Sequence, residues 1–112
     1  MPIFFRWMHV TPWKQDVESC DRVGVIQMLP AGDAEKDVTG RRWEQRKELM
    51  RDVIIYMRNN PSILFYESGN ESISREHMVE MIAIRDQYDP YGGRAIGSRE
   101  MLDIREAEYG GE

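Results

Sequence analysis

Apolar residues along this chain fall into short runs separated by longer stretches in which they recur at helical spacing. Runs at residues 3–8, 25–29 and 62–68, and a shorter one at 94–97, are bounded by turn-forming residues and predict four strands. The three stretches between them carry apolar residues three and four positions apart, which predicts one helix in each. This alternation predicts an α/β fold of parallel strands joined by right-handed crossovers.

The first predicted helix has signals at both ends. Thr11 followed by Pro12 predicts an N-cap and a proline at the first helical position, and Gly24 suits the helix end. The apolar spacing predicts a buried face made of Trp13, Val17, Cys20 and Val23.

The second predicted helix, from Gly40 onward, is the longest. It should end at residues 59–61 (NNP), because the residue before a proline avoids the helical conformation. Ser74 is expected to cap the third helix, with Glu76 in its first turn. The predicted buried faces are Trp43, Arg46 or Lys47, Met50, Val53, Ile54 and Met57 in the second helix, and Met78, Met81, Ile82 and Arg85 in the third.

Composition narrows the class of protein. The chain has 112 residues, 41% hydrophobic and 31% charged, with a net charge of −5, which is typical of one small globular domain. No block of Lys and Arg stands out, so we expect no nucleic-acid partner. Cys20 is the single cysteine, which excludes an intrachain disulfide.

Targeting signals are absent from the sequence itself. No apolar run is long enough to span a bilayer, so we expect no membrane partner. Residues 1–6 lack a signal-peptide pattern. This leaves the compartment open, because a longer parent protein with its own N-terminus is compatible with secretion or a periplasmic location.

Residues 58–71 (RNNPSILFYESGNE) form the most informative segment of the chain. The segment reads as a helix end, a strand that is apolar on both faces, and a carboxylate, Glu71, just beyond that strand. In α/β folds, catalytic and binding residues gather at the carboxyl ends of parallel strands. Glu71 is therefore the first candidate for chemistry.

This segment resembles the region around the general acid/base of glycoside hydrolase family 2, the family of β-galactosidases and β-glucuronidases. There an Arg-Asn-His-Pro-Ser sequence, an apolar strand and a Gly-Asn-Glu sequence follow one another. Other segments resemble the family in the same order: residues 6–9 (RWMH), 21–24 (DRVG), and 88–90 (YDP) with 94–95 (RA). The resemblance spans most of the chain.

The resemblance implies a catalytic (β/α)8 TIM barrel, a fold of about 250 residues. A chain of 112 residues would then hold strands two to five of that barrel, with about four parallel strands alternating with three helices. We therefore expect residues 1–98 to form a partial barrel domain and residues 99–112 to form a polar tail.

By this resemblance Glu71 is the general acid/base. A retaining glycosidase must protonate the leaving oxygen and later deprotonate a water, and one carboxyl group serves both steps if burial raises its pKa. Without the surrounding motif, the simpler interpretation of Glu71 is an ordinary loop carboxylate or helix-entry acid.

Two neighbouring residues are implied to bind substrate. Asn70 would hydrogen-bond the sugar hydroxyl beside the anomeric carbon, and His9 would contact further sugar hydroxyls. The simpler interpretations are a turn asparagine and a strand-end histidine bonded to the backbone. Trp7 and Trp13 could stack on sugar, but tryptophans at these spacings are more often core residues.

Arg6 and Glu67 are expected to give structural support. Glu67 shares a strand face with Glu71, which predicts that it points into the barrel. A buried carboxylate needs a cation, and Arg6 is a candidate. The family usually has a small residue at the position of Glu67, so this chain departs from it there.

Two features of the family are missing. Asp33 and Glu35 follow the second predicted strand, where family members carry an acidic stretch and, downstream of it, a glutamate that binds magnesium in some of them. Here that pattern is broken, and two loop acids are too few ligands, so we expect no metal and no cofactor. The family's nucleophile lies on the seventh strand, beyond residue 112, and the surroundings of Glu100 and Asp103 do not resemble it. We therefore expect the isolated chain to be inactive.

The sequence thus predicts a fragment of a retaining, β-galactosidase-like glycoside hydrolase acting on β-linked sugars, which carries the acid/base but lacks the nucleophile. One alternative is a non-catalytic half-barrel that self-associates through uncovered barrel surfaces or binds carbohydrate. Another is an independent α/β module whose resemblance is accidental. The sugar is not determined, because specificity depends on loops and domains that the chain lacks.

Overall fold

The computed structural model describes residues 4–7, 12–30, 37–69 and 73–98, and gives backbone alone for Phe4–Arg6 and Gly69. Within these ranges seven elements follow one another: β1 (Phe4–Arg6), α1 (Lys14–Val23), β2 (Ile26–Pro30), α2 (Arg41–Met57), β3 (Ile63–Gly69), α3 (Arg75–Tyr88) and β4 (Ala95–Ser98). The alternation of strands and helices predicted from the hydrophobic pattern is confirmed. The expected tail, residues 99–112, lies outside the described residues.

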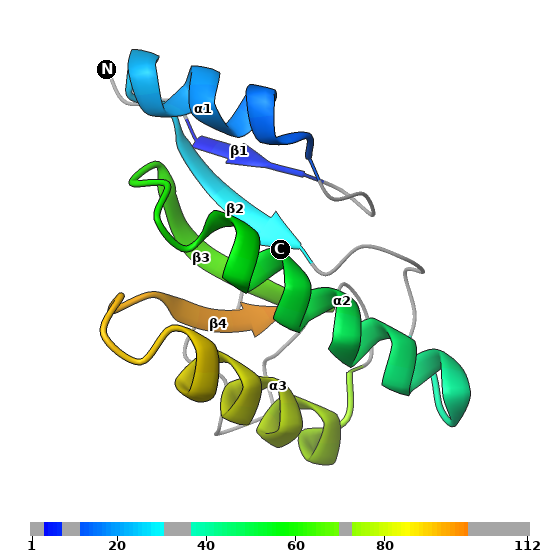
Figure 1. The fold of residues 1–112 in the computed structure, drawn as a ribbon. Helices are drawn as coiled ribbons and strands as arrows, with labels where there is room; N and C mark the ends of the chain where they lie inside the picture. Colours follow the sequence, from blue (N-terminus) through cyan, green and yellow to red (C-terminus); the bar gives the residue numbers. More distant parts are fainter. Residues whose placement is uncertain (1–3, 8–11, 31–36, 70–72, 99–112) are drawn as a thin grey trace.

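The strands form one parallel sheet in the order β1-β2-β3-β4. The three helices lie together in front of this sheet in Figure 1, so they cover the same face of it. Strands in sequential order, joined by helices on one side, are what a segment of a (β/α)8 barrel shows. The predicted fold class is therefore confirmed.

The core lies between the sheet and the helix layer. Its centre is a row of register partners across three strands, Leu29, Tyr66 and Ile96, each fully buried. Helix residues cover this row, and they include Val17, Met50, Ile54, Met78 and Met81. The methionines fill the space between helices and strands, as their flexible side chains allow.

Helices α2 and α3 agree closely with the pattern read from the sequence. The buried residues of α2 are Trp43, Arg46, Met50, Val53, Ile54 and Met57, which decides between Arg46 and Lys47. Ser74 caps α3, and its Oγ accepts the backbone N–H of His77 at 3.2 Å. In α3, Met78 and Met81 are fully buried, while Ile82 and Arg85 are half-buried.

The start of α1 was predicted wrongly. Its N-cap is Trp13 rather than Thr11, which lies outside the described residues. Trp13 and Val23 are each 74% exposed, so the buried face consists of Val17 and Cys20 alone. The physical reason is that α1 packs mainly on β2, near one side of the sheet, and such a helix buries a narrow stripe. Gly24 does end the helix, with φ of 80° and its N–H bonded to the Cys20 carbonyl.

Candidate active site

The carboxyl ends of the four strands lie along one edge of the sheet, because all the strands are parallel. At this edge β3 ends at Gly69, which is the register partner of Ser98 at the end of β4. Glu71 follows Gly69 by two residues in the chain. We call this side of the sheet the carboxyl edge, and it is where the candidate site belongs.

Among the predicted site residues, the structure describes the side chain of Glu67. His9, Asn70 and Glu71 lie outside the described residues, and Arg6 is described as the last backbone position of β1. The catalytic and substrate-binding assignments, and the support expected from Arg6, therefore stay predictions.

Glu67 is buried near the carboxyl end of β3, with 4% of its surface exposed. Its neighbour Tyr66 belongs to the core row that the helices cover. Successive side chains of a strand point to opposite faces, so Glu67 points away from the helices. In a complete barrel that face is the interior, and the supporting role expected of Glu67 stays a prediction.

Asp37 fastens two connections to each other at the carboxyl edge. One carboxylate oxygen, Oδ2, accepts the backbone N–H of Ser74 at 3.0 Å, and Oδ1 accepts the N–H of Val38 at 3.0 Å. The same carboxylate lies 2.8 Å from Nδ1 of His77, in the first turn of α3. The segment that precedes α2 is thereby tied to the start of α3.

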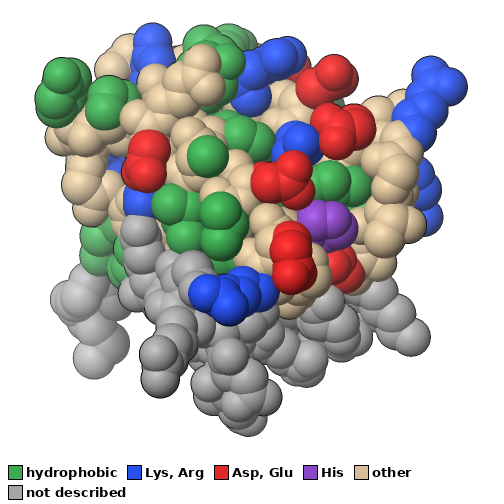
Figure 2. Space-filling view, turned by 90° about the horizontal axis from the view of Figure 1, so that it is seen from below, with side chains coloured by type: hydrophobic (Ala, Val, Ile, Leu, Met, Phe, Trp, Pro, Cys, Tyr) green, Lys and Arg blue, Asp and Glu red, His purple; other side chains and the backbone are tan. Residues whose placement is uncertain are grey.

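His77 is held on its other side by α2. Its ring stacks on the Trp43 indole, with centroids 3.7 Å apart and planes 11° from parallel. Trp43 donates from Nε1 to Glu80 at 2.8 Å, and Lys47 reaches the other oxygen of Glu80 at 3.1 Å. His77 is half-buried, and Figure 2 shows a histidine side chain at the surface beside acidic side chains.

These contacts shift the pKa values of two charged groups. Burial opposes ionisation of Glu80, but the hydrogen bonds from Lys47 and Trp43 lower the pKa of its carboxyl group. Hydrogen bonds to Glu80 and Glu44 raise the pKa of Lys47. Both groups therefore remain charged around neutral pH, and the link between α2 and α3 is an ion pair.

A second polar cluster lies at the opposite edge of the sheet, where the strands begin. Asp21, near the end of α1, accepts hydrogen bonds from the backbone and hydroxyl of Ser62 and from the amide of Asn60. Partial burial opposes ionisation, but these hydrogen bonds lower the pKa of the Asp21 carboxyl group. Asp21 thus joins α1 to the turn that leads into β3.

Hydrogen bonds extend this cluster from Ser62 to β2 and to the residue that follows β1. Ser62 accepts a hydrogen bond from Nε2 of Gln27, a fully buried residue of β2, at 2.8 Å. The Oε1 atom of Gln27 accepts from the Trp7 indole at 2.7 Å. Gln27 precedes Leu29 by two residues and so shares the helix-covered face. Trp7 therefore takes part in this network, although it is half-buried and does not belong to the core that was expected for it.

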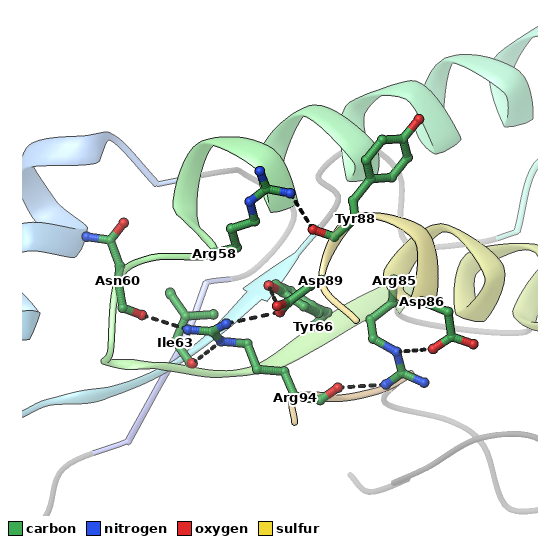
Figure 3. Close-up of polar contacts among 9 residues, drawn as sticks. All are labelled: Arg58, Asn60, Ile63, Tyr66, Arg85, Asp86, Tyr88, Asp89 and Arg94. Carbon is green, nitrogen blue, oxygen red and sulfur yellow. Dashed lines mark hydrogen bonds and ion pairs between the residues drawn. The ribbon is translucent and has the colours of Figure 1, made fainter. Parts of the chain in front are cut away.

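Arg94 completes this edge beside β3 and β4. Its guanidinium donates to the carbonyl oxygens of Ile63 at 2.6 Å and Asn60 at 3.1 Å, and contacts Asp89 at 3.0 Å (Figure 3). The Tyr66 hydroxyl donates to the same Asp89 oxygen at 2.7 Å. Burial and this hydrogen bond raise the pKa of Tyr66. The phenol stays protonated and serves as a permanent donor.

The motif residues of the sequence therefore divide into two groups. Asp21, Asn60, Ser62, Asp89 and Arg94 hold the amino-terminal edge of the sheet together, so their role is structural. The residues with proposed chemistry follow the strand ends at the other edge. The sequence did not predict the contact between Asp37 and His77 at the carboxyl edge, because neither residue belongs to a recognisable motif.

The described residues add two negative observations. Within residues 4–7, 12–30, 37–69 and 73–98, no group of three or more His, Cys, Asp or Glu side chains is arranged to hold a metal ion. None of the helices in this part of the chain is long and apolar enough to cross a membrane.

Known proteins are similar to this chain in sequence and in fold. A curated β-glucuronidase of Formosa agariphila is 33% identical over 96 residues, which cover 86% of this chain and 10% of that protein. The structure of a β-glucuronidase from glycoside hydrolase family 2 is 33% identical, with a TM-score of 0.84 over 87% of this chain and 10% of that one. A putative β-galactosidase from Bacteroides fragilis shares the fold at 21% identity, with a TM-score of 0.76 over 96% of this chain and 17% of that chain. No model of a known protein family matches the chain.

The fold defines the chain as a segment of a (β/α)8 barrel, and the names of the relatives place it in a glycosidase family. With the two relatives at 33% identity, the chain belongs to glycoside hydrolase family 2. It spans about a tenth of the length of either relative.

Proposed function

We propose that this chain is the part of a retaining β-glycosidase barrel that carries the general acid/base, Glu71, without the nucleophile. The observation that carries the proposal is the position of Glu71 in the chain, two residues beyond the carboxyl end of β3. Active sites of barrel enzymes form at this end of the strands. The names of the relatives, β-glucuronidases among them, support glycosidic bond cleavage.

In this mechanism Glu71 acts twice. As an acid it protonates the glycosidic oxygen of the leaving group, and as a base it later takes a proton from the water that attacks the anomeric carbon and breaks the bond between the sugar and the enzyme. Asn70 donates to the sugar hydroxyl next to the anomeric carbon, a bond that strengthens in the transition state. His9 contacts other hydroxyls of the same sugar.

The second carboxylate must come from elsewhere in the barrel. Retaining enzymes hold the two carboxyl groups about 5–5.5 Å apart, on facing sides of the scissile bond. The described part of this chain forms four strands, whereas the complete barrel has eight. We therefore expect the 112-residue chain to lack turnover, and a longer protein that contains it to be active.

A β-linked glucuronide is the first substrate to test, because both relatives at 33% identity are β-glucuronidases. A β-galactoside is the next, in view of the fold shared with a putative β-galactosidase. Asn70, His9 and Glu71 serve either sugar, since they act on groups that the two share.

The test begins with the DNA on both sides of the reading frame. If coding continues into further barrel strands, the longer protein is assayed with p-nitrophenyl β-glucuronide and β-galactoside. Glu71→Gln should lower kcat by about 100-fold to 10,000-fold, whereas Glu76→Gln, an exposed acid in the first turn of α3, should not. Turnover by the pure 112-residue chain that depends on Glu71 would contradict the missing nucleophile.

A second candidate is a non-catalytic half-barrel that associates with itself. It is favoured by the strand order, because four sequential parallel strands with helices on one face are half of a closed barrel. Light scattering on the isolated chain separates the two cases. A stable dimer without turnover, from a reading frame with its own start and stop, would favour this candidate.

A further inference from the structure

A groove runs between α1 and α2 in the helix layer, the layer that lies on the outside of a complete barrel. Its volume is about 430 Å³, and small-molecule sites usually have volumes of about 300–1,000 Å³. Val53 and Met57 of α2 give it a buried apolar lining, with 4% and 2% of their surfaces exposed. All the residues that line the groove belong to the described ranges. The groove therefore has the size and the lining of a small-ligand site.

Two large aromatic side chains are exposed beside this groove. Trp13, at the N-cap of α1, is 74% exposed, and Tyr56, in the last turn of α2, is 62% exposed. No described residue forms a hydrogen bond with the indole N–H of Trp13 or with the hydroxyl of Tyr56. Exposed aromatic rings around a concave surface are typical of binding sites, because they bury a large area against a ligand. The two rings favour a ligand with an apolar face and a polar edge.

Lys14 brings a positive charge into the same groove. Its ammonium group donates to the carbonyl oxygen of Tyr56 at 3.0 Å and to the side-chain oxygen of Asn60. The same ammonium lies 5.1 Å from the centroid of the Tyr56 ring. These two hydrogen bonds use two of the three N–H groups of a lysine. Lys14 is therefore held in place and keeps one donor for a ligand.

The carboxylates near Lys14 have other partners. Asp52, which also lines the groove, pairs with Arg51 at 3.0 Å. Asp21 is separated from Lys14 by the amide of Asn60, which donates to Asp21 and accepts from Lys14. Within the described residues Lys14 forms no ion pair, so a ligand carboxylate would complement its charge.

We propose that the groove between α1 and α2 is a second saccharide site, which binds a β-linked sugar that carries a carboxylate. The C–H face of the pyranose packs on Trp13 and Tyr56, because the faces of aromatic rings carry partial negative charge. The carboxylate of the sugar pairs with Lys14, and its hydroxyls bond to the Tyr56 hydroxyl and the Gln15 amide at the rim. The choice of a sugar as ligand rests on the proposed function, whereas the site shares no residue with the proposed catalytic group.

The test titrates the 15N-labelled 112-residue chain with methyl β-glucuronide and, separately, with methyl β-glucoside, which lacks the carboxylate. Methyl glycosides are used because an aryl group would itself stack on the rings. We expect a saturable shift of the Trp13 indole N–H signal with a dissociation constant of about 1 mM for the glucuronide. The glucoside should bind about 3-fold to 10-fold more weakly, since it makes no charge-assisted bond to Lys14.

Four variants locate the sugar, with the backbone amide of Gln15 as the reporter. Trp13→Ala and Tyr56→Ala should each weaken the binding of both sugars by about 10-fold. Lys14→Met should reduce glucuronide binding to the level of the glucoside and leave glucoside binding unchanged. Val23→Ala is the matched control, because Val23 is also 74% exposed on α1 but does not line the groove. It should change neither dissociation constant.

Three results would overturn the inference: no saturable shift at Trp13 with either sugar, binding that Trp13→Ala and Tyr56→Ala leave unchanged, or an equal loss in Val23→Ala. Binding that is lost in Glu71→Gln but kept in Trp13→Ala would also overturn it, because the sugar would then occupy the carboxyl edge. The turnover of the longer protein and its loss in Glu71→Gln are separate measurements. A failure of the proposed function and a failure of the groove as a sugar site are therefore distinguishable.

Discussion

Asp37 and Ser74 are 37 positions apart in the sequence, and a 3.0 Å hydrogen bond joins the carboxylate of one to the backbone nitrogen of the other. This bond fastens the connection before α2 to the connection before α3 at the carboxyl edge. At the opposite edge, Asp21 joins α1 to the start of β3 through Asn60 and Ser62. Half-buried carboxylates thus join the connections at both ends of the sheet. We expect such contacts to contribute measurably to the free energy of unfolding.

Asp21→Ala should lower the free energy of unfolding by about 2–4 kcal/mol, since it leaves the donors of Ser62 and Asn60 without their acceptor in a partly buried place. Urea unfolding followed by circular dichroism measures this loss. Asp52→Ala is the matched control, because the carboxylate of Asp52 is exposed and pairs with Arg51 at the surface. That change should cost less than about 1 kcal/mol, and an equal cost at both positions would contradict the structural role of Asp21.

The Asp21 cluster also predicts a dependence of stability on pH. The pKa of Asp21 is lowered in the folded chain, so its contribution is fully present above the unfolded-state pKa of about 3.9 and is lost as the pH falls through the folded value. Wild type should therefore lose more stability than Asp21→Asn as the pH falls from neutral to below about 3.9. Acid unfolding of the two proteins can be followed by tryptophan fluorescence. If wild type and Asp21→Asn unfold with the same pH midpoint, the prediction is wrong.

Arg94→Ala should be among the most damaging single changes, costing about 3–5 kcal/mol. It removes the cation that balances the buried Asp89 and two carbonyl contacts. Tyr66→Phe keeps the ring in the core and removes one donor to Asp89, so about 1–2 kcal/mol is expected. Thermal unfolding of both variants tests whether Arg94→Ala loses more stability than Tyr66→Phe. Tyr91→Phe is the control, and it should leave the unfolding temperature unchanged because Tyr91 is exposed.

Two tryptophans give a direct test of the corrected packing of α1. Trp13→Ala should change stability by less than about 0.5 kcal/mol because the side chain is 74% exposed. Trp43→Ala should cost about 3–5 kcal/mol because it leaves a cavity in the core and removes the stack on His77. Similar losses for the two variants would show that the first helix buries Trp13 after all.

Local signals in the sequence were enough for most of the fold. Helix α2 could be predicted with its buried face because six apolar or amphipathic positions recur over 17 residues. Ser74 and Gly24 marked helix ends because capping depends on the residue itself. Helix α1 was predicted less well, since Trp13 and Val23 follow the helical spacing but lie where no neighbouring element covers them.

By itself, the sequence determined the alternation of strands and helices, the end of α1, the start of α3 and the membership of a glycosidase family, because periodicity, capping and motifs are properties of neighbouring residues. Only the tertiary structure showed that Asp21, Asn60 and Ser62 form one cluster, that Arg94 closes the same edge, and that Asp37 reaches Ser74 and His77. These contacts join residues 31 to 41 positions apart, and their partners are determined by how parallel strands bring distant turns to a common edge.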